Sequence, residues 1–246
     1  EYSEVHMAKN IKKRSASHIY FGVNKLTGEL KHISEVPSGQ KCNCICAACL
    51  QPFEARKGPR RCHHFAHVSN YECMYASEVA IYKAFAEALK QSGFLALPPV
   101  MLRFPAWHDP ELLQEARRMK IDSVAFECEP LSYPPLLRVT MQGTPLRILL
   151  DFDRYYDDDD RVELAEEAKA EDYSLLLISM PKIDQDTEFT PDRLQSALQD
   201  NDRTEWVFSR LEEQWKQKYY AVAVSPPEHG TGNLCPISFG KYKGKY

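Results

Sequence analysis

The chain lacks any long apolar run and any excess of charge of one sign. Its longest apolar stretches, such as residues 175–180, are far too short to span a bilayer, so we expect no membrane partner. No charged-then-apolar segment of the secretory kind opens the sequence, so we expect a cytoplasmic protein. Lys and Arg number 31 against 35 Asp and Glu, and this balance does not indicate a nucleic-acid-binding protein.

Composition and length are those of an ordinary globular protein. Hydrophobic residues make up 43% and charged residues 27%, and 246 residues suffice for one large domain or two smaller ones. Charge is distributed unevenly, with basic runs at 9–14 and 57–61 and an acidic run at 151–160. The basic runs are either solvated surface or local phosphate-binding patches.

Cysteine is the most informative residue type. Six of the eight Cys fall between residues 42 and 73, interleaved with His. In a chain without a secretory signal, such clustering indicates metal binding rather than disulfide bonds.

Four residues of this segment have the spacing of zinc ligands. Cys46 and Cys49 are separated by two residues, so both thiolates can meet one ion in a knuckle. His64 and His67 follow after a gap formed by residues 50–63, about one helical turn apart. The sequence therefore predicts a closed, structural zinc site with ligands Cys46, Cys49, His64 and His67. Neighbouring side chains remain alternative ligands, namely Cys42, Cys44, Cys62, His63 and Cys73.

Local patterns predict alternating strands and helices. A hairpin is expected over residues 18–36, and residues 94–110 read as irregular. A helix is expected over 78–91, capped by Ser77 and ended by Gly93, because Ile81, Phe85 and Leu89 recur at helical spacing. Further strands are expected at 121–128, 136–141, 146–151 and 173–180, and further helices at 160–170, 191–198 and 204–219.

Several of these segments together resemble a known protein family. Residues 36–49 (VPSGQKCNCICAAC), 55–58 (ARKG) and 63–67 (HHFAH), with Cys73 and then Ser77-Glu78, are similar to the competence-protein CoiA-like proteins of bacteria. The resemblance is specific over about residues 16–90 and weaker over 120–215.

The resemblance implies a fold class and a domain organisation. It implies an α/β protein in which an N-terminal β-hairpin and zinc ribbon (1–73) precede a restriction-endonuclease-like domain (74–220). That domain is a mixed sheet flanked by helices. Residues 221–246 would be a tail or the start of a truncated further module, because Cys235 has no second Cys pair after it. The sequence begins with Glu1 rather than Met, and we expect it to be part of a longer product.

The resemblance also implies a nuclease site that binds Mg²⁺ or Mn²⁺. Glu78, Asp122 and Asp151 occupy the positions of the family's carboxylates, and Asp153 shares a strand face with Asp151. Carboxylates at one end of a sheet hold the metal that activates water for phosphodiester hydrolysis. The sequence departs from the family at Tyr82, where His is expected. Asp153 stands where the catalytic Lys should be, so Arg147, Arg154, Lys169 or a second metal would have to polarise the phosphate.

Two functional hypotheses follow. The first is a Mg²⁺- or Mn²⁺-dependent nuclease acting on DNA, whose structural zinc ribbon helps to bind nucleic acid. The second is a catalytically degenerate nuclease-fold subunit that binds nucleic acid or a protein partner. Each carboxylate also has an ordinary structural interpretation: Glu78 suits a helix N-terminus, Asp122 suits a strand end, and residues 157–160 suit the start of the next helix.

Overall fold

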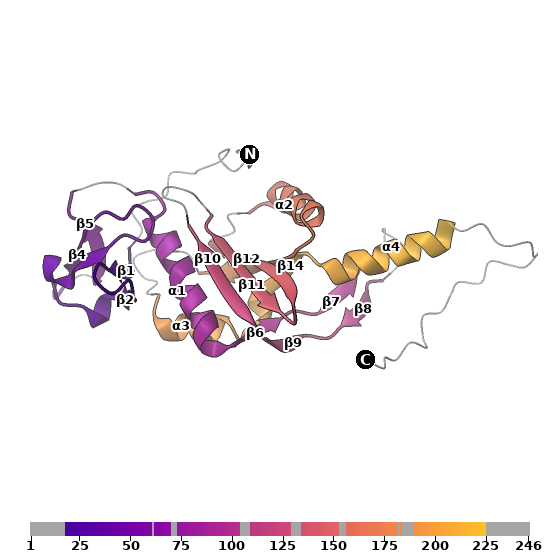
Figure 1. Ribbon diagram of the computed structural model, residues 1–246, viewed down its shortest axis with the longest axis horizontal. Helices are drawn as coiled ribbons and strands as arrows, with labels where there is room; N and C mark the ends of the chain where they lie inside the picture. Colours follow the sequence, from indigo (N-terminus) through magenta and orange to yellow (C-terminus); the bar gives the residue numbers. More distant parts are fainter. Residues whose placement is uncertain are drawn as a thin grey trace, which may run out of the picture.

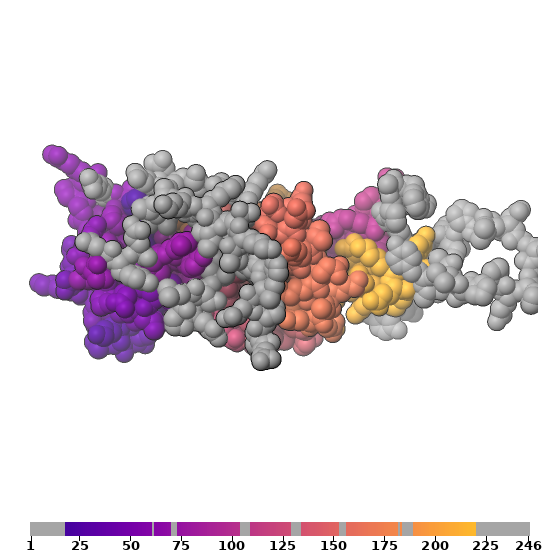
Figure 2. All heavy atoms as spheres, turned by 90° about the horizontal axis from the view of Figure 1, so that it is seen from above, coloured from indigo at the N-terminus to yellow at the C-terminus, as the bar shows by residue number. Residues whose placement is uncertain are grey.

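The computed structural model describes residues 18–60, 62–69, 73–103, 109–128, 134–152, 156–181, 183 and 189–224. The N-terminal strands and the C-terminal helix α4 lie at opposite ends of the long axis, with the main sheet between them (Figures 1 and 2). Among the described residues, none of the helices combines the length and the hydropathy that a membrane-spanning helix needs.

A five-stranded mixed sheet forms the centre of the protein. Its strand order is β10-β11-β12-β13-β14. The first three strands form an antiparallel meander, β12 and β13 are parallel, and β14 pairs antiparallel with β13. The predicted mixed sheet is confirmed. Its strands are β10 (Ser123–Glu127), β11 (Leu136–Met141), β12 (Thr144–Phe152), β13 (Ser174–Met180) and β14 (Thr204–Phe208).

Helices cover both faces of this sheet. Side chains alternate along a strand, so Ile148 and Leu150 join the core that includes α1 (Ala76–Ser92), while Leu149 joins the core that includes α2 (Asp158–Ala170). Strand β13 is apolar almost throughout because both of its faces are buried. The mixed sheet flanked by helices is therefore confirmed as the fold class (Figure 1).

Two of the three helix-end signals read from the sequence are found in the structure. Asp157 and Asp160 form a reciprocal capping box at the start of α2, as the acidic run predicts. Gly93 ends α1 in the left-handed conformation with φ of 65°. Ser77 does not cap α1 as predicted, because its hydroxyl donates instead to the carbonyl of His18 at 3.3 Å.

One predicted helix is in part a strand. The sequence predicts a helix over 204–219, but β14 occupies the first five positions and α4 (Arg210–Val224) begins after it. Trp206, Val207 and Phe208 favour an extended strand, and the open edge of β13 offers backbone partners. Ser209 then caps α4 through a hydrogen bond from the amide of Glu212.

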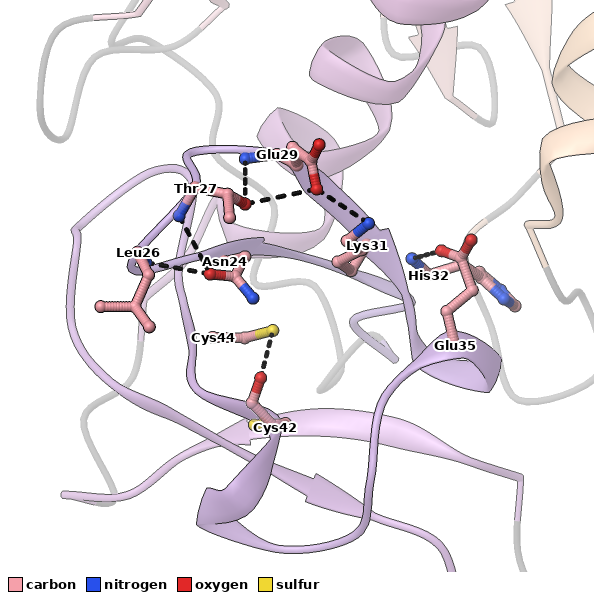
Figure 3. Close-up of polar contacts among 9 residues, drawn as sticks. All are labelled: Asn24, Leu26, Thr27, Glu29, Lys31, His32, Glu35, Cys42 and Cys44. Carbon is pink, nitrogen blue, oxygen red and sulfur yellow. Dashed lines mark hydrogen bonds and ion pairs between the residues drawn. The ribbon is translucent and has the colours of Figure 1, made fainter.

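The N-terminal region, defined as residues 18–69, is built from small β-hairpins. The predicted first hairpin is confirmed: Asn24 Oδ1 accepts from the amides of Leu26 and Thr27 at its turn, 2.9 and 3.1 Å away (Figure 3). A second hairpin, β4–β5, lies inside the Cys/His segment. The strands here are β1 (Phe21–Asn24), β2 (Leu30–His32), β3 (Cys44–Ile45), β4 (Phe53–Arg56) and β5 (His64–His67), with short helices η1 (Ile33–Glu35) and η2 (Gln40–Cys42).

The segment 94–110 is predicted to be irregular, but its described part contains strands β6 and β7. Strand β6 pairs with β9 and β7 pairs with β8, so that one strand pair is nested within the other in the sequence. One apolar core runs from Tyr20 and Phe65 through α1 to Ile148, so the N-terminal region and the sheet pack as one body. The remaining elements are β6 (Phe94–Leu97), β7 (Val100–Leu102), β8 (Glu111–Gln114), β9 (Arg117–Lys120), α3 (Pro191–Ala197) and η3 (Asn201–Arg203).

Candidate metal centre and carboxylate cluster

Four side chains from three separate segments converge between the N-terminal region and α1. Cys46 and Cys49 lie in the turn after β3, His67 ends β5, and Cys73 precedes α1 by three residues. Their ligand atoms all lie within 4.8 Å of one another, and Cys49 Sγ is 3.2 Å from His67 Nε2. This cluster could hold a metal ion.

Cys73 stands in this cluster where the sequence predicts His64. The prediction assumed one helical turn between His64 and His67, but both residues lie on strand β5. Side chains three positions apart on a strand point to opposite faces, so only one of the two can reach the knuckle. The His64 ring packs against the ring of His18 with centroids 4.7 Å apart, and its Nδ1 lies 3.0 Å from the carbonyl of Cys62.

The other alternative ligands have different surroundings. Cys42 and Cys44 are buried, and the Cys42 thiol donates to the carbonyl of Phe53 at 3.4 Å. The Cys44 thiol donates to the carbonyl of Cys42 at 3.2 Å (Figure 3). Cys62 and His63 are exposed. Cys42 and Cys44 therefore serve the packing of the N-terminal region.

The thiols of the cluster share hydrogen bonds that separate their pKa values. The Cys46 thiol donates to Cys73, which lowers the pKa of Cys73 to about 6 and raises that of Cys46. Burial raises the pKa of Cys49 and lowers that of His67, so the imidazole is neutral at pH 7. The amide of Ala48 also points at Cys46 Sγ, 3.4 Å away. The hydrogen bonds among the thiols favour negative charge on Cys73, whereas a cation would have to displace the protons of Cys46 and Cys49.

The donor set fits zinc. Three thiolates and one imidazole are a common structural set, with zinc–sulfur and zinc–nitrogen distances of about 2.3 and 2.1 Å in a tetrahedron. Ligand atoms within 4.8 Å of one another can meet these distances with small movements. Four protein ligands close the coordination sphere, so such an ion would hold the knuckle, β5 and the start of α1 together.

The predicted carboxylate site does not assemble as expected. Asp122 precedes β10, and its Oδ2 accepts from the amide of Gly143 in the β11–β12 turn at 3.1 Å. Asp151 lies near the other end of β12. Asp151 lies seven positions after Thr144, and at about 3.3 Å per residue these two ends of β12 are on the order of 20 Å apart. Asp122 and Asp151 therefore cannot share an ion, which corrects the predicted grouping.

Glu78 and Asp151 are both buried, at 2% exposed, and the charge of each acts on the hydroxyl of Tyr82. That hydroxyl accepts a hydrogen bond from the amide of Leu150 at 2.7 Å. Burial raises the pKa of Tyr82, and the two carboxylates raise it further. Asp151 also has Arg161 Nη2 3.8 Å from its Oδ2 and the amide of Tyr156 3.4 Å from its Oδ1.

The side chains expected to replace the catalytic Lys are engaged elsewhere. Arg147 binds Glu167 and the Tyr173 hydroxyl, 2.7 and 2.5 Å away, and Lys169 binds Glu213 at 3.1 Å. Asp153 and Arg154 lie outside the described residues, as does Cys235. Within the described residues, the Cys46, Cys49, His67 and Cys73 group is the one convergent set of three or more Cys, His, Asp or Glu ligands.

No protein family, curated protein or solved structure matches this chain.

Proposed function

We propose that the protein is a zinc-stabilised, restriction-endonuclease-like module that binds nucleic acid through its N-terminal region without cleaving it. The fold supports this proposal. Helix α1 is followed, after the strand pairs formed by β6 to β9, by the three-stranded meander β10-β11-β12, the crossover helix α2 and the parallel strand β13. This order of elements agrees with the resemblance over residues 120–215.

The position of Asp122 is the observation against cleavage. A hydrolytic Mg²⁺ site in such a fold needs carboxylates from neighbouring strand ends. Strand β11 pairs with β12, and its start lies next to Asp151. The residues there are Pro134, Pro135 and Leu136, none of which has a carboxylate. Arg161 already gives Asp151 a cationic neighbour at 3.8 Å. These contacts support a structural role for Asp151.

The charge of the N-terminal region supports nucleic-acid binding. The chain as a whole carries −4, yet this region has an excess of basic side chains. Lys41 and Arg60 are exposed, whereas the amine of Lys57 donates to the carbonyls of Ser34 and Val36. Its described basic residues are Lys25, Lys31, Lys41, Arg56, Lys57 and Arg60, against Glu29, Glu35 and Glu54.

Binding to duplex DNA at increasing salt tests this proposal. Each phosphate contact contributes about −0.9 to the slope of log K against log salt, so replacing Lys41 and Arg60 by Gln should flatten the slope by roughly 2. The double variant Lys90→Gln/Arg138→Gln removes the same charge elsewhere and should leave the slope unchanged. Equal slopes for all three proteins, or no binding by the zinc-loaded protein, would contradict the proposal.

A second candidate function is a single-metal nuclease. Glu78 and Asp151 favour it, because they are two buried carboxylates whose charges both act on the Tyr82 hydroxyl, and two carboxylates with waters can hold one Mg²⁺. Mn²⁺ binding, measured by calorimetry on the zinc-loaded protein, separates the candidates. Binding that is lost in both Glu78→Gln and Asp151→Asn supports the nuclease, and no binding supports the non-hydrolytic function.

A further inference from the structure

A second candidate site lies at the end of the sheet away from Asp151. A cavity of about 410 Å³ opens there between the strand pairs β6–β9 and β7–β8, the β11–β12 turn and the start of α4. Pockets of about 300–1,000 Å³ are typical of small-molecule sites. None of the residues in the zinc cluster or around Tyr82 lines this cavity.

The charges of the lining favour an anion. Arg117 and Arg210 line the cavity, and none of its described lining residues is Asp or Glu. Arg210 is paired with Asp172, so Arg117 supplies the positive charge of this lining that no described carboxylate offsets. Arg117 forms no ion pair with any described residue.

Arg210 is held in place at the wall of this cavity. Its Nη2 binds Asp172 Oδ2 at 2.8 Å, and its amide donates to Ser174 Oγ at 3.2 Å, so the side chain is anchored. Its Nε is buried and has no acceptor among the described residues. A guanidinium that is already fixed at the wall of the cavity loses little further freedom when it meets an anionic group.

The rest of the lining suits a planar group. The indole of Trp206 is fixed by a hydrogen bond from Nε1 to the carbonyl of Pro98 at 3.2 Å, and Met119 and Met141 add apolar surface. Gln142 and Gln214 add amides that can donate and accept. An aromatic surface with amides nearby suits a nucleobase, which has both an apolar face and a hydrogen-bonding edge.

We propose that this cavity binds a nucleoside monophosphate group, with the phosphate at Arg117 and Arg210 and the base near Trp206. The group is either a free mononucleotide or the phosphorylated end of a strand. The site requires neither the zinc cluster nor cleavage. Only the strand-end source rests on the proposed nucleic-acid-binding function.

Calorimetry on the zinc-loaded protein tests the site with adenosine 5′-monophosphate, adenosine and inorganic phosphate. Adenosine 5′-monophosphate should bind saturably. Adenosine alone and inorganic phosphate alone should each bind at least about tenfold more weakly, because each lacks either the charged hydrogen bond or the contact of the base. Arg117→Gln should weaken the monophosphate about tenfold or more. Arg118→Gln is the matched control, because Arg118 is the next residue on β9 but its guanidinium stacks on the ring of Phe94. This control variant should change the affinity for the monophosphate by less than about twofold.

Oligonucleotides with and without a 5′-phosphate identify the source. Tighter binding of the phosphorylated strand, lost in Arg117→Gln, assigns the strand end, and no preference assigns the free mononucleotide. No saturable binding of the monophosphate, or equal losses in the two Arg variants, overturns the proposal. If the monophosphate does not bind but duplex DNA binding still depends on Lys41 and Arg60, the proposal for this cavity is wrong and the proposed nucleic-acid-binding function stands.

Discussion

Replacing Cys73 should remove most of the zinc affinity, whereas replacing His64 should not. Cys73 contributes one of the four converging ligand atoms, and the His64 ring lies against His18 instead. Structural zinc sites contribute about 10–16 kcal/mol, so loss of one ligand in four should cost about 3 kcal/mol, or on the order of a hundredfold in affinity. We expect His64→Ala to stay within about threefold of the parent protein, since no metal–ligand bond is lost.

Competition with a chelator measures these affinities directly. Cys73→Ser and His64→Ala are titrated beside the parent protein, and Cys62→Ser serves as a control because Cys62 is exposed and outside the cluster. Cobalt substitution adds a second readout, since the thiolate-to-cobalt absorption falls in proportion to the thiolates lost. Full zinc affinity in Cys73→Ser together with its loss in His64→Ala would refute the assignment of the cluster.

Three further outcomes follow from the same contacts. Leu50 follows the knuckle in the left-handed conformation, with φ of 60°, and is 59% exposed. Leu50→Gly should therefore relieve backbone strain and raise the free energy of unfolding by about 1 kcal/mol in a denaturant titration. A lower free energy of unfolding would contradict this reasoning. Tyr82→Phe should cost about 1–3 kcal/mol in the same assay, because the buried Leu150 amide loses its acceptor, and an unchanged midpoint would count against that contact. Zinc affinity should fall at least about tenfold per pH unit below pH 7, because the pKa values of Cys46 and Cys49 are raised and zinc must displace their protons. An affinity that stays constant from pH 7 to pH 6 would contradict the ligand set.

Elements dictated by local chemistry were predictable from the sequence. The apolar run of β13 indicates a buried strand, the residues around Gly28 indicate a turn, and Asp157 with Asp160 indicates a helix start. Each of these depends on side chains close together in the chain. The Cys46–Cys49 knuckle belongs to the same class, since two residues between thiols suffice to define it.

Features that depend on pairing between distant segments were not predictable. The choice of Cys73 over His64 depends on β5 being a strand, which follows from its pairing with β4. The position of Asp122 depends on strand order, because β11 between β10 and β12 makes those two strands run in the same direction. Strand β14 forms because the edge of β13 is available. The Arg210 cavity likewise joins segments more than 90 residues apart.

Incubation of zinc-loaded protein with single- and double-stranded DNA tests the central claim most directly. Binding and cleavage are followed in the same samples with Mg²⁺ or Mn²⁺, for the parent protein and for Asp151→Asn. We expect salt-dependent binding by both proteins and intact DNA in every sample. Cleavage by the parent protein that disappears in Asp151→Asn would contradict the non-hydrolytic function and establish the nuclease.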